Sequence, residues 1–200
     1  MEKNNLRDIA LKSIDETIFY PPQGQTRLRS MIETRPDWCV SRQRVWGVPL
    51  PLFVNKKTGQ PLRDENIINR IAYIYEKEGS NTWFTEDPQR FLGDEYSLED
   101  YEQVKDVVEV WFDSGSTHAF CLEQREDLKW PASMYLEGSD QHRGWFHSSL
   151  LESSGTRGKA PYESVLTHGF VVDGRGRKMS KSVGNVCLLY TSPSPRDLRK

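Results

Sequence analysis

The chain has 200 residues, 36% of them hydrophobic and 11% aromatic, and a formal net charge of −2. This composition is typical of a globular protein with one good core or two small ones, and the charge excludes binding that depends on a strongly basic protein. No apolar run approaches the ~20 residues that span a bilayer, and the N-terminus lacks the apolar region of a secretory signal. Three dispersed cysteines form no CxxC pair, so we expect neither zinc nor disulfides, and a cytoplasmic setting without membrane partners.

The first fifty residues predict short elements separated by prolines. Apolar side chains recur at helical spacing over residues 6–14, which indicates an amphipathic helix. Pro21 and Pro22 cannot continue that helix, and a second one is expected over residues 27–32. The stretch 46–53 has an extended pattern, in which two prolines favour an edge or irregular strand.

The composition and the pattern of the sequence change at residue 55. Isoleucines and other apolar residues at helical spacing predict a helix over 64–78 that ends near Gly79. Acidic sequence rich in loops then continues to residue 106. We interpret residues 55–106 as an insertion that packs on the side of a larger fold.

The remaining sequence indicates an α/β fold. Apolar runs predict three strands, over residues 107–112, 134–138 and 164–172. A helix fits between the last two strands, with Gly155 as its C-terminal stop. Strand, helix and strand at this spacing predict a right-handed parallel crossover.

Each predicted strand is followed by a polar cluster: "DSGSTH", "GSDQHRGW" and "DGRGRKMSKS". Ligands of open parallel sheets bind beyond the carboxyl ends of the strands. Three such loops meeting at one edge of the sheet would form a binding site.

In "YLEGSDQHRGW", Gly138 allows a tight turn and close approach of a ligand to the backbone. Ser139 or Asp140 could cap the following helix, and a carboxylate there could accept hydrogen bonds from ribose hydroxyls or an ammonium group. Ordinary helix capping explains this stretch about equally well, and Trp145 taken alone fits a core position. Glu137 points more firmly to a function, because a carboxylate that ends a buried strand needs a partner.

The stretch "GRGRKMSKS", residues 174–182, combines flexible glycines with four cations and two hydroxyl side chains. Such a loop can close over a polyphosphate and neutralise the charge that develops in phosphoryl or nucleotidyl transfer. It does not follow the order of a P-loop. A solvated basic loop is the simpler alternative, but such a loop would not require this particular order of residues.

The spelling "KMSKS" is the signature of class I aminoacyl-tRNA synthetases. With "RPDWCVSRQRVWGVPLP", "VWFDSGSTH", "YLEGSDQHRGWFHSSLL" and "LTHGFVVDGRGRKMSKSVGN", the chain resembles the isoleucyl-tRNA synthetase family over residues 6–186. The resemblance implies the second half of a Rossmann-type catalytic domain. On this resemblance, residues 1–54 re-enter the catalytic domain after the editing insertion, and residues 55–106 form a smaller connective insertion. Residues 107–186 form the half-domain with the signature loop, and residues 187–200 form a tail.

The resemblance also implies roles for individual residues. Glu137, Gly138, Asp140 and Gln141 would line the aminoacyl-adenylate pocket, and Trp145 with Trp111 would border the isoleucine side chain. His168 and Gly169 would lie near the adenine of ATP, with Ser180 and Lys181 also on ATP and Lys178 assisting. The implied reaction is activation of isoleucine by ATP with Mg²⁺ and transfer to tRNA(Ile), by an enzyme that is monomeric at full length and has no structural metal in this segment.

Two departures limit this reading. The family's H-x-G-H pair is absent from this sequence, and the editing domain and the downstream helical and anticodon-binding regions are missing as well. We therefore expect a piece of a synthetase that is inactive alone; the alternatives are a truncated paralogue with a binding or regulatory role and a valine-specific relative. The final stretch "CLLYTSPSPRDLRK" loses hydrophobic periodicity, and we expect it to be disordered and foreign to the fold.

Overall fold

The computed structural model describes residues 1–186. The helices are α1 (Leu6–Glu16), α2 (Gln23–Glu33), α3 (Glu65–Glu78), α4 (Thr82–Thr85), α5 (Gln89–Leu92), α6 (Val110–Gly115) and α7 (Trp145–Arg157), with short helical turns η1 (His118–Leu122) and η2 (Ser139–His142). The strands are β1 (Ile18–Tyr20), β2 (Ser41–Arg42), β3 (Phe53–Asn55), β4 (Tyr101–Gln103), β5 (Val107–Val108), β6 (Tyr135–Gly138) and β7 (Ser164–His168). Within residues 1–186, none of the helices is long and apolar enough to cross a bilayer.

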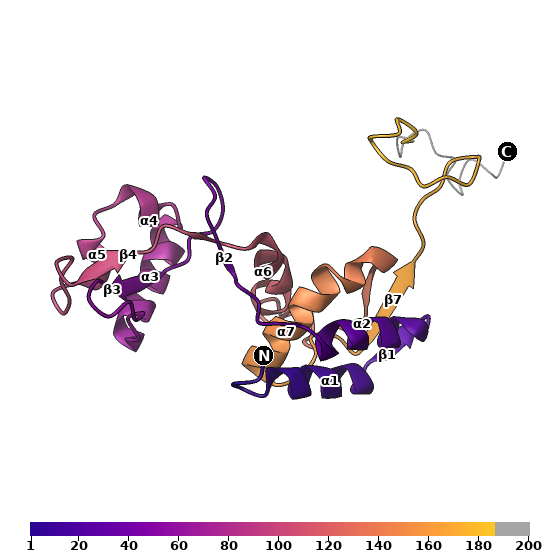
Figure 1. Cartoon of the computed structure of the whole chain (residues 1–200), viewed down its shortest axis with the longest axis horizontal. Helices are drawn as coiled ribbons and strands as arrows, with labels where there is room; N and C mark the ends of the chain where they lie inside the picture. Colours follow the sequence, from indigo (N-terminus) through magenta and orange to yellow (C-terminus); the bar gives the residue numbers. More distant parts are fainter. Residues whose placement is uncertain (187–200) are drawn as a thin grey trace.

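A parallel sheet of three strands lies at the centre of the larger part of the molecule. Its order is β1-β7-β6, so the last strand lies between one strand from the start of the chain and one from its second half. Figure 1 shows α1, α2 and α7 gathered around this sheet, whereas α3, α4, α5 and the β3–β4 pair lie at the opposite end. The predicted β6–α7–β7 unit is therefore present, and its two strands are parallel and adjacent, as expected.

The sheet and its helices share one hydrophobic core. Aliphatic residues of α1 and α2 pack there with the inward residues of the strands and the buried side of α7. Because these side chains come from both halves of the sequence, the core joins residues 6–33 to residues 135–165. Its buried members are Ala10, Ile14, Phe19, Leu28, Ile32, Tyr135, Phe146, Leu150, Leu151, Ala160, Tyr162 and Val165.

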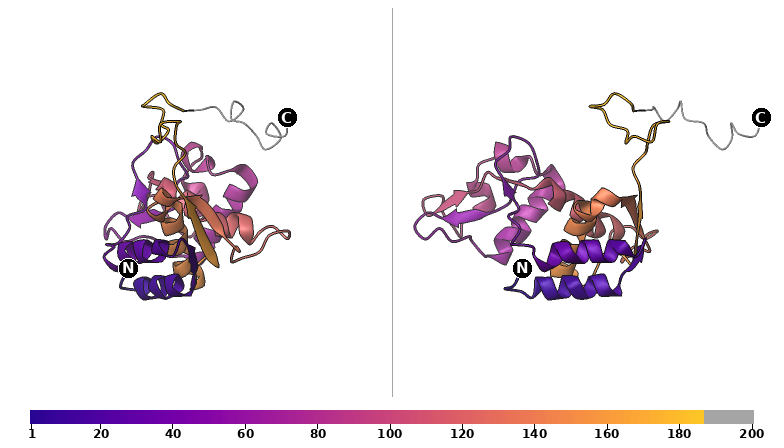
Figure 2. Two further views of the ribbon diagram at one scale, coloured as in Figure 1. Left: turned by 90° about the vertical axis from the view of Figure 1, so that its right-hand side faces the viewer. Right: turned by 45° about the vertical axis from the view of Figure 1, so that its right-hand side comes forward.

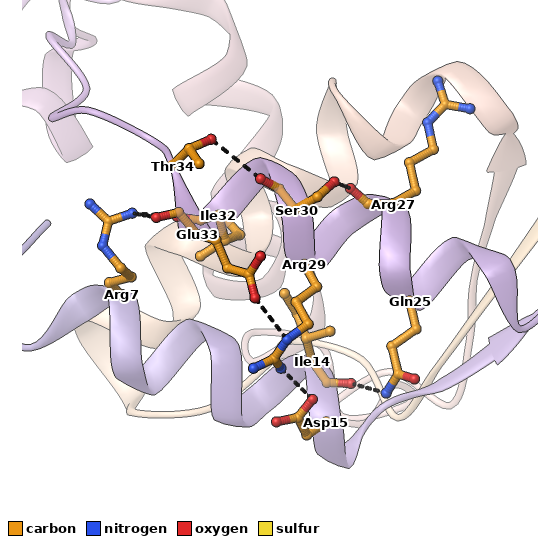
Figure 3. Close-up of polar contacts among 10 residues, drawn as sticks. All are labelled: Arg7, Ile14, Asp15, Gln25, Arg27, Arg29, Ser30, Ile32, Glu33 and Thr34. Atoms are coloured by element: carbon orange, nitrogen blue, oxygen red, sulfur yellow. Dashed lines mark hydrogen bonds and ion pairs between the residues drawn. The ribbon is translucent and has the colours of Figure 1, made fainter.

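Polar contacts fasten α1 to α2 (Figure 3). The guanidinium of Arg7 donates hydrogen bonds to three carbonyls at the end of α2, those of Ile32, Glu33 and Arg35, the last at 2.8 Å. The final carbonyls of a helix have no partner within it, so Arg7 satisfies groups that would otherwise need water. Arg29 adds an ion pair with Asp15, at 2.5 Å between Nη1 and Oδ1.

A second core lies around α3. Asp64 accepts hydrogen bonds from the backbone N–H groups of Asn66 and Ile67, which fixes the first turn, and Gly79 ends the helix with φ of +88°. The predicted helix over 64–78 is thus confirmed almost to the residue. This core contains Phe53, Ile67, Ile71, Ile74, Trp83, Phe91 and Leu92.

The predicted strand over 107–112 is wrong. Within this run only Val107 and Val108 form a strand, and they pair antiparallel with β2 rather than joining the parallel sheet. The chain then forms α6, which packs against α7. A close approach is possible because Gly115 faces the backbone of Ser148, where a Cβ would lie 3.0 Å from the carbonyl carbon. Packing against α7 overrides the strand preference of this apolar run.

Other boundaries differ in smaller ways. The helix expected over 27–32 begins earlier, at Gln23, and strand β1 was not predicted because three residues show no periodicity. The strand expected over 164–172 ends at His168. Gly155 lies inside α7, and the helix ends instead at Gly158, whose φ is +74°. The expectation of a foreign tail over 187–200 falls outside the described residues.

Candidate active site

The site begins where β6 ends. Glu137 pairs in register with Thr167, and Gly138 pairs with His168, so the ends of β6 and β7 meet at one edge of the sheet. Gly138 is buried, and a Cβ there would lie 2.7 Å from Oδ1 of Asp140 and 3.9 Å from Cε1 of His168. A side chain at this position would force the carboxylate of Asp140 to move and would lie in ordinary van der Waals contact with His168.

The turn after β6 is stabilised by Gln141. Neither Ser139 nor Asp140 caps a helix, contrary to expectation, since the side chains at the start of η2 and of α7 make no capping bond. Oε1 of Gln141 instead accepts a hydrogen bond from the backbone N–H of Trp145 at 3.1 Å. Gln141 therefore orients the first residue of α7, and Asp140 keeps its carboxylate exposed.

Two indole rings flank this turn. Trp145 lies parallel to the ring of Tyr135 and donates from Nε1 to the carbonyl of Ser114 at 2.8 Å, so β6, α6 and α7 all fix its position. Trp111, on α6, is 43% exposed. Its ring lies over Gly144, where a Cβ would come within 3.0 Å of Cη2. The change from strand to helix thus leaves Trp111 beside the predicted residues of the turn.

The carboxylates near the turn differ in their surroundings. Glu137 and Asp140 are exposed, so Glu137 does not need the protein partner that a buried strand end would have required. On α6, burial and the negative charge of Glu109 raise the pKa of Asp113. Glu137 and Asp140 are therefore the acceptors that a ligand can reach at this edge.

His168 and Gly169 follow directly at the end of β7. Both are exposed, and Nδ1 of His168 lies 2.6 Å from the carbonyl oxygen of Gly169. Cε1 of His168 would contact a Cβ at Gly138, so His168 lies next to the turn after β6. Eight predicted residues thus come together at this edge of the sheet: Trp111, Glu137, Gly138, Asp140, Gln141, Trp145, His168 and Gly169.

The remaining predicted residues lie on a separate feature, the lysine loop, defined here as residues 170–185. Nζ of Lys178 lies 3.4 Å from the ring centroid of Phe170, a cation–π contact within the loop. Lys181 is exposed, and Oγ of Ser180 is 3.2 Å from Oγ of Ser182. Figures 1 and 2 show the loop standing away from the sheet, and no hydrogen bond among the described residues joins it to the turn after β6.

Sequence reasoning missed several residues that hold these groups in place. Tyr135 was assigned only to a strand, and stacking on Trp145 is not visible in a strand pattern. Asp173 and Asn185 bind the backbone of the lysine loop. Their role was not predicted, although both lie in the sequence motif quoted for that loop. The order of residues around the lysines in that motif was the only signal, and it did not indicate hydrogen bonds.

A family model of "tRNA synthetases class I (I, L, M and V)" matches residues 1–190. The chain belongs to the class I tRNA synthetase family. The isoleucine–tRNA ligase of Pelagibacter ubique is 69% identical over 200 residues, which cover all of this chain and 21% of that protein. The isoleucine–tRNA ligase of Zymomonas mobilis is 61% identical over 181 residues, which cover 90% of this chain and 19% of that protein. The chain thus spans about a fifth of the length of these synthetases.

A solved class I synthetase shares the fold. The crystal structure of Mycobacterium tuberculosis methionyl-tRNA synthetase, bound by methionyl-adenylate, superposes with a TM-score of 0.52 at 18% identity. The match covers 93% of this chain and 28% of that one. The predicted α/β, Rossmann-type fold class is therefore confirmed.

Proposed function

We propose that the chain forms part of the active site of an isoleucine–tRNA ligase. The observation that carries this proposal is 69% identity, along the whole chain, to a protein with that name. The edge of the sheet supports it, because exposed carboxylates, a close glycine turn and two indoles lie together there. These groups suit an amino acid with an apolar side chain joined to a ribose and a phosphate.

In the proposed complex, the aminoacyl-adenylate lies over the end of β6. Glu137 and Asp140 accept hydrogen bonds from the ammonium group and the ribose hydroxyls, and Gly138 lets the backbone approach the ligand. Gln141 holds the turn in place. Trp111 and Trp145 border the isoleucine side chain, where planar rings exclude water. His168 and Gly169 border the adenine.

The first reaction is the attack of the isoleucine carboxylate on the α-phosphorus of ATP. One carboxylate oxygen forms the new P–O bond, and the bond to the β-phosphate breaks and releases pyrophosphate. We propose Lys178 and Lys181 as the catalytic residues, since their ammonium groups can neutralise the charge that moves onto the leaving pyrophosphate. Ser180 adds a hydroxyl donor to the phosphates.

Mg²⁺ would enter with ATP in this proposal. Among residues 1–186, no group of three or more histidine, cysteine, aspartate or glutamate side chains is placed to hold a metal ion. In this proposal the cation binds to the phosphates of the substrate. When bound, it neutralises phosphate charge. The second reaction transfers the isoleucyl group to the 3′-terminal adenosine of tRNA(Ile) and releases AMP.

A chimaera tests the proposal. Residues 1–186 would replace the matched segment of the Pelagibacter ubique enzyme, and isoleucine-dependent exchange of pyrophosphate into ATP would be measured. We expect exchange with isoleucine in preference to valine, and a loss of at least 100-fold in Lys181→Ala. Lys12→Ala, an exposed lysine on α1, is the matched control and should keep full activity. Exchange that prefers valine, or that persists in Lys181→Ala, would contradict the proposal.

A further inference from the structure

The lysine loop is a short hairpin with a tight turn. Val172 and Lys178 form an antiparallel bridge, and the N–H of Met179 donates to the carbonyl of Val171 at 2.9 Å. The turn closes through the N–H of Asp173, which donates to the carbonyl of Arg177 at 2.9 Å. Gly176 has φ of +74°, a conformation that side chains rarely allow. Lys178 is therefore the residue that comes directly after a turn whose backbone is held by these hydrogen bonds.

The carboxylate of Asp173 binds this turn with both oxygens. Oδ1 accepts hydrogen bonds from the backbone N–H groups of Arg175 and Arg177 at 2.9 and 3.0 Å. Oδ2 accepts from Nε of Arg177 at 3.0 Å and from Nδ2 of Asn185 at 2.9 Å. Only 14% of the Asp173 side chain is exposed, although it lies in a loop rich in glycine and arginine.

Asn185 binds the far side of the loop. Its Nδ2 donates to the carbonyl of Lys178 at 3.2 Å as well as to Asp173, and its Oδ1 accepts from the N–H of Ser180 at 2.9 Å. The N–H of Gly184 donates to the carbonyl of Lys181 at 3.2 Å. One carboxylate and one amide therefore hold the backbone on both sides of the two lysines.

We propose that Asp173 and Asn185 are positioning residues that hold the backbone of Lys178 and Lys181 in one conformation before a polyphosphate binds. This inference rests on the proposed function of the two lysines. Among the described residues, no acidic side chain pairs with Lys181, so its ammonium group remains available to phosphate oxygens. A fixed backbone lets the cation stabilise charge without first ordering a loop around the ligand.

The test uses the 200-residue chain and three backbone amides as reporters. Asp173→Asn replaces Oδ2 with an N–H₂ group that faces the donors on Arg177 and Asn185. Amide hydrogen exchange, followed by NMR, should accelerate about tenfold at Arg175, Arg177 and Ser180. Asp127→Asn removes an exposed carboxylate paired with Arg125 and is the matched control; it should leave these three rates unchanged.

A second variant separates positioning from a general loss of structure. In the exchanged pair, Asp173→Asn with Asn185→Asp, an N–H₂ group at position 173 again faces an acceptor at position 185, which can still accept from the N–H of Ser180. The bond to the carbonyl of Lys178 is lost, so part of the protection at Ser180 should return. ATP titrations of the same proteins should show weaker binding in Asp173→Asn, recovery in the exchanged pair, and unchanged melting temperatures throughout.

The outcomes distinguish this inference from the proposed function. Unchanged exchange rates in Asp173→Asn would overturn the inference, and so would faster exchange with unaltered ATP affinity. Lys181→Ala should weaken ATP binding without accelerating exchange at Ser180. If Lys181→Ala instead binds ATP like the parent chain, the proposed function fails and the positioning role fails with it, whereas the amide rates still show whether the two side chains order the loop.

Discussion

The indole ring of Trp145 stacks on the phenol ring of Tyr135, with centroids 4.2 Å apart and planes inclined by 8°. Tyr135 belongs to the core, and Trp145 borders the proposed isoleucine site. One aromatic pair thus connects the packing of the sheet to the position of a site residue.

Tyr135→Ala should lower the free energy of unfolding by about 3–5 kcal/mol, because it removes a buried aromatic ring from the core. Tyr135→Phe loses only the contact of the hydroxyl with Ser149 and should cost about 1 kcal/mol. Urea unfolding measures both values. Tyr73→Ala, at an exposed position on α3, should change stability by less than about 0.5 kcal/mol. Equal losses in Tyr135→Ala and Tyr73→Ala would show that the stacked ring does not support the core.

Two glycine substitutions should act in opposite directions. Gly144→Ala brings a methyl group within 2.5 Å of Oε1 of Gln141 and 3.0 Å of Trp111, so it should destabilise the chain and displace both side chains. Gly155→Ala lies inside α7 with its closest neighbour at 3.6 Å, and should stabilise by about 0.5–1 kcal/mol. Chemical denaturation of the two variants checks the signs. A loss of stability in Gly155→Ala would mean that this position ends the helix after all.

The stability of the chain should fall as the pH rises from the ordinary pKa of a glutamate to about 8. Burial, with the charges of Asp113 and Glu109, raises the pKa of Glu152 on α7 to about 8. The folded chain therefore keeps a proton that the unfolded chain has lost, between the ordinary pKa of a glutamate and about pH 8. Unfolding releases this proton, so the free energy of unfolding decreases across that window.

Glu152→Gln mimics the protonated side chain and tests this expectation. At pH 9 the variant should be more stable than the parent chain by about 3 kcal/mol, and the difference should nearly vanish at pH 4.5. Glu163→Gln, at an exposed carboxylate paired with Lys129, should keep the pH dependence of the parent. Parallel stability–pH curves for Glu152→Gln and the parent would contradict the raised pKa.

The 200-residue chain alone should not catalyse isoleucine-dependent exchange of pyrophosphate into ATP. Its histidines, His118, His142, His147 and His168, form no H-x-G-H pair, the motif that the resemblance implies for the side of ATP opposite the lysines. The assay is radioactive pyrophosphate exchange on the purified chain. Activity that disappears in Lys181→Ala would show that these residues suffice for catalysis.

The sequence predicted the elements whose signals are local. The helix at 64–78 was found because its apolar residues follow one face and Asp64 and Gly79 mark its ends. The β6–α7–β7 unit was found because two apolar runs flank a segment of helical length. Residues 107–112 were misassigned because an apolar run does not reveal its packing partner, and here α7 stabilises a helix.

The candidate site likewise contains features that the sequence predicted and features that it did not. Glu137, Gly138 and Asp140 were placed correctly at the end of β6, whereas His168 was expected inside a longer strand and lies at the end of β7. The bond from Gln141 to Trp145 depends on the path of the turn, which residue types alone do not specify.

The internal bonds of the lysine loop have an entropic consequence. Residues 171–185 are joined to one another, and the chain reaches them from β7 through Gly169 and Phe170. Fixing the backbone of a free residue costs about 1–2 kcal/mol, so ordering a slack loop of this length around a ligand would cost many times that amount. A loop that is already ordered within itself loses freedom at only a few torsions when it moves onto a ligand. Most of the attraction between its lysines and a phosphate chain then remains as affinity.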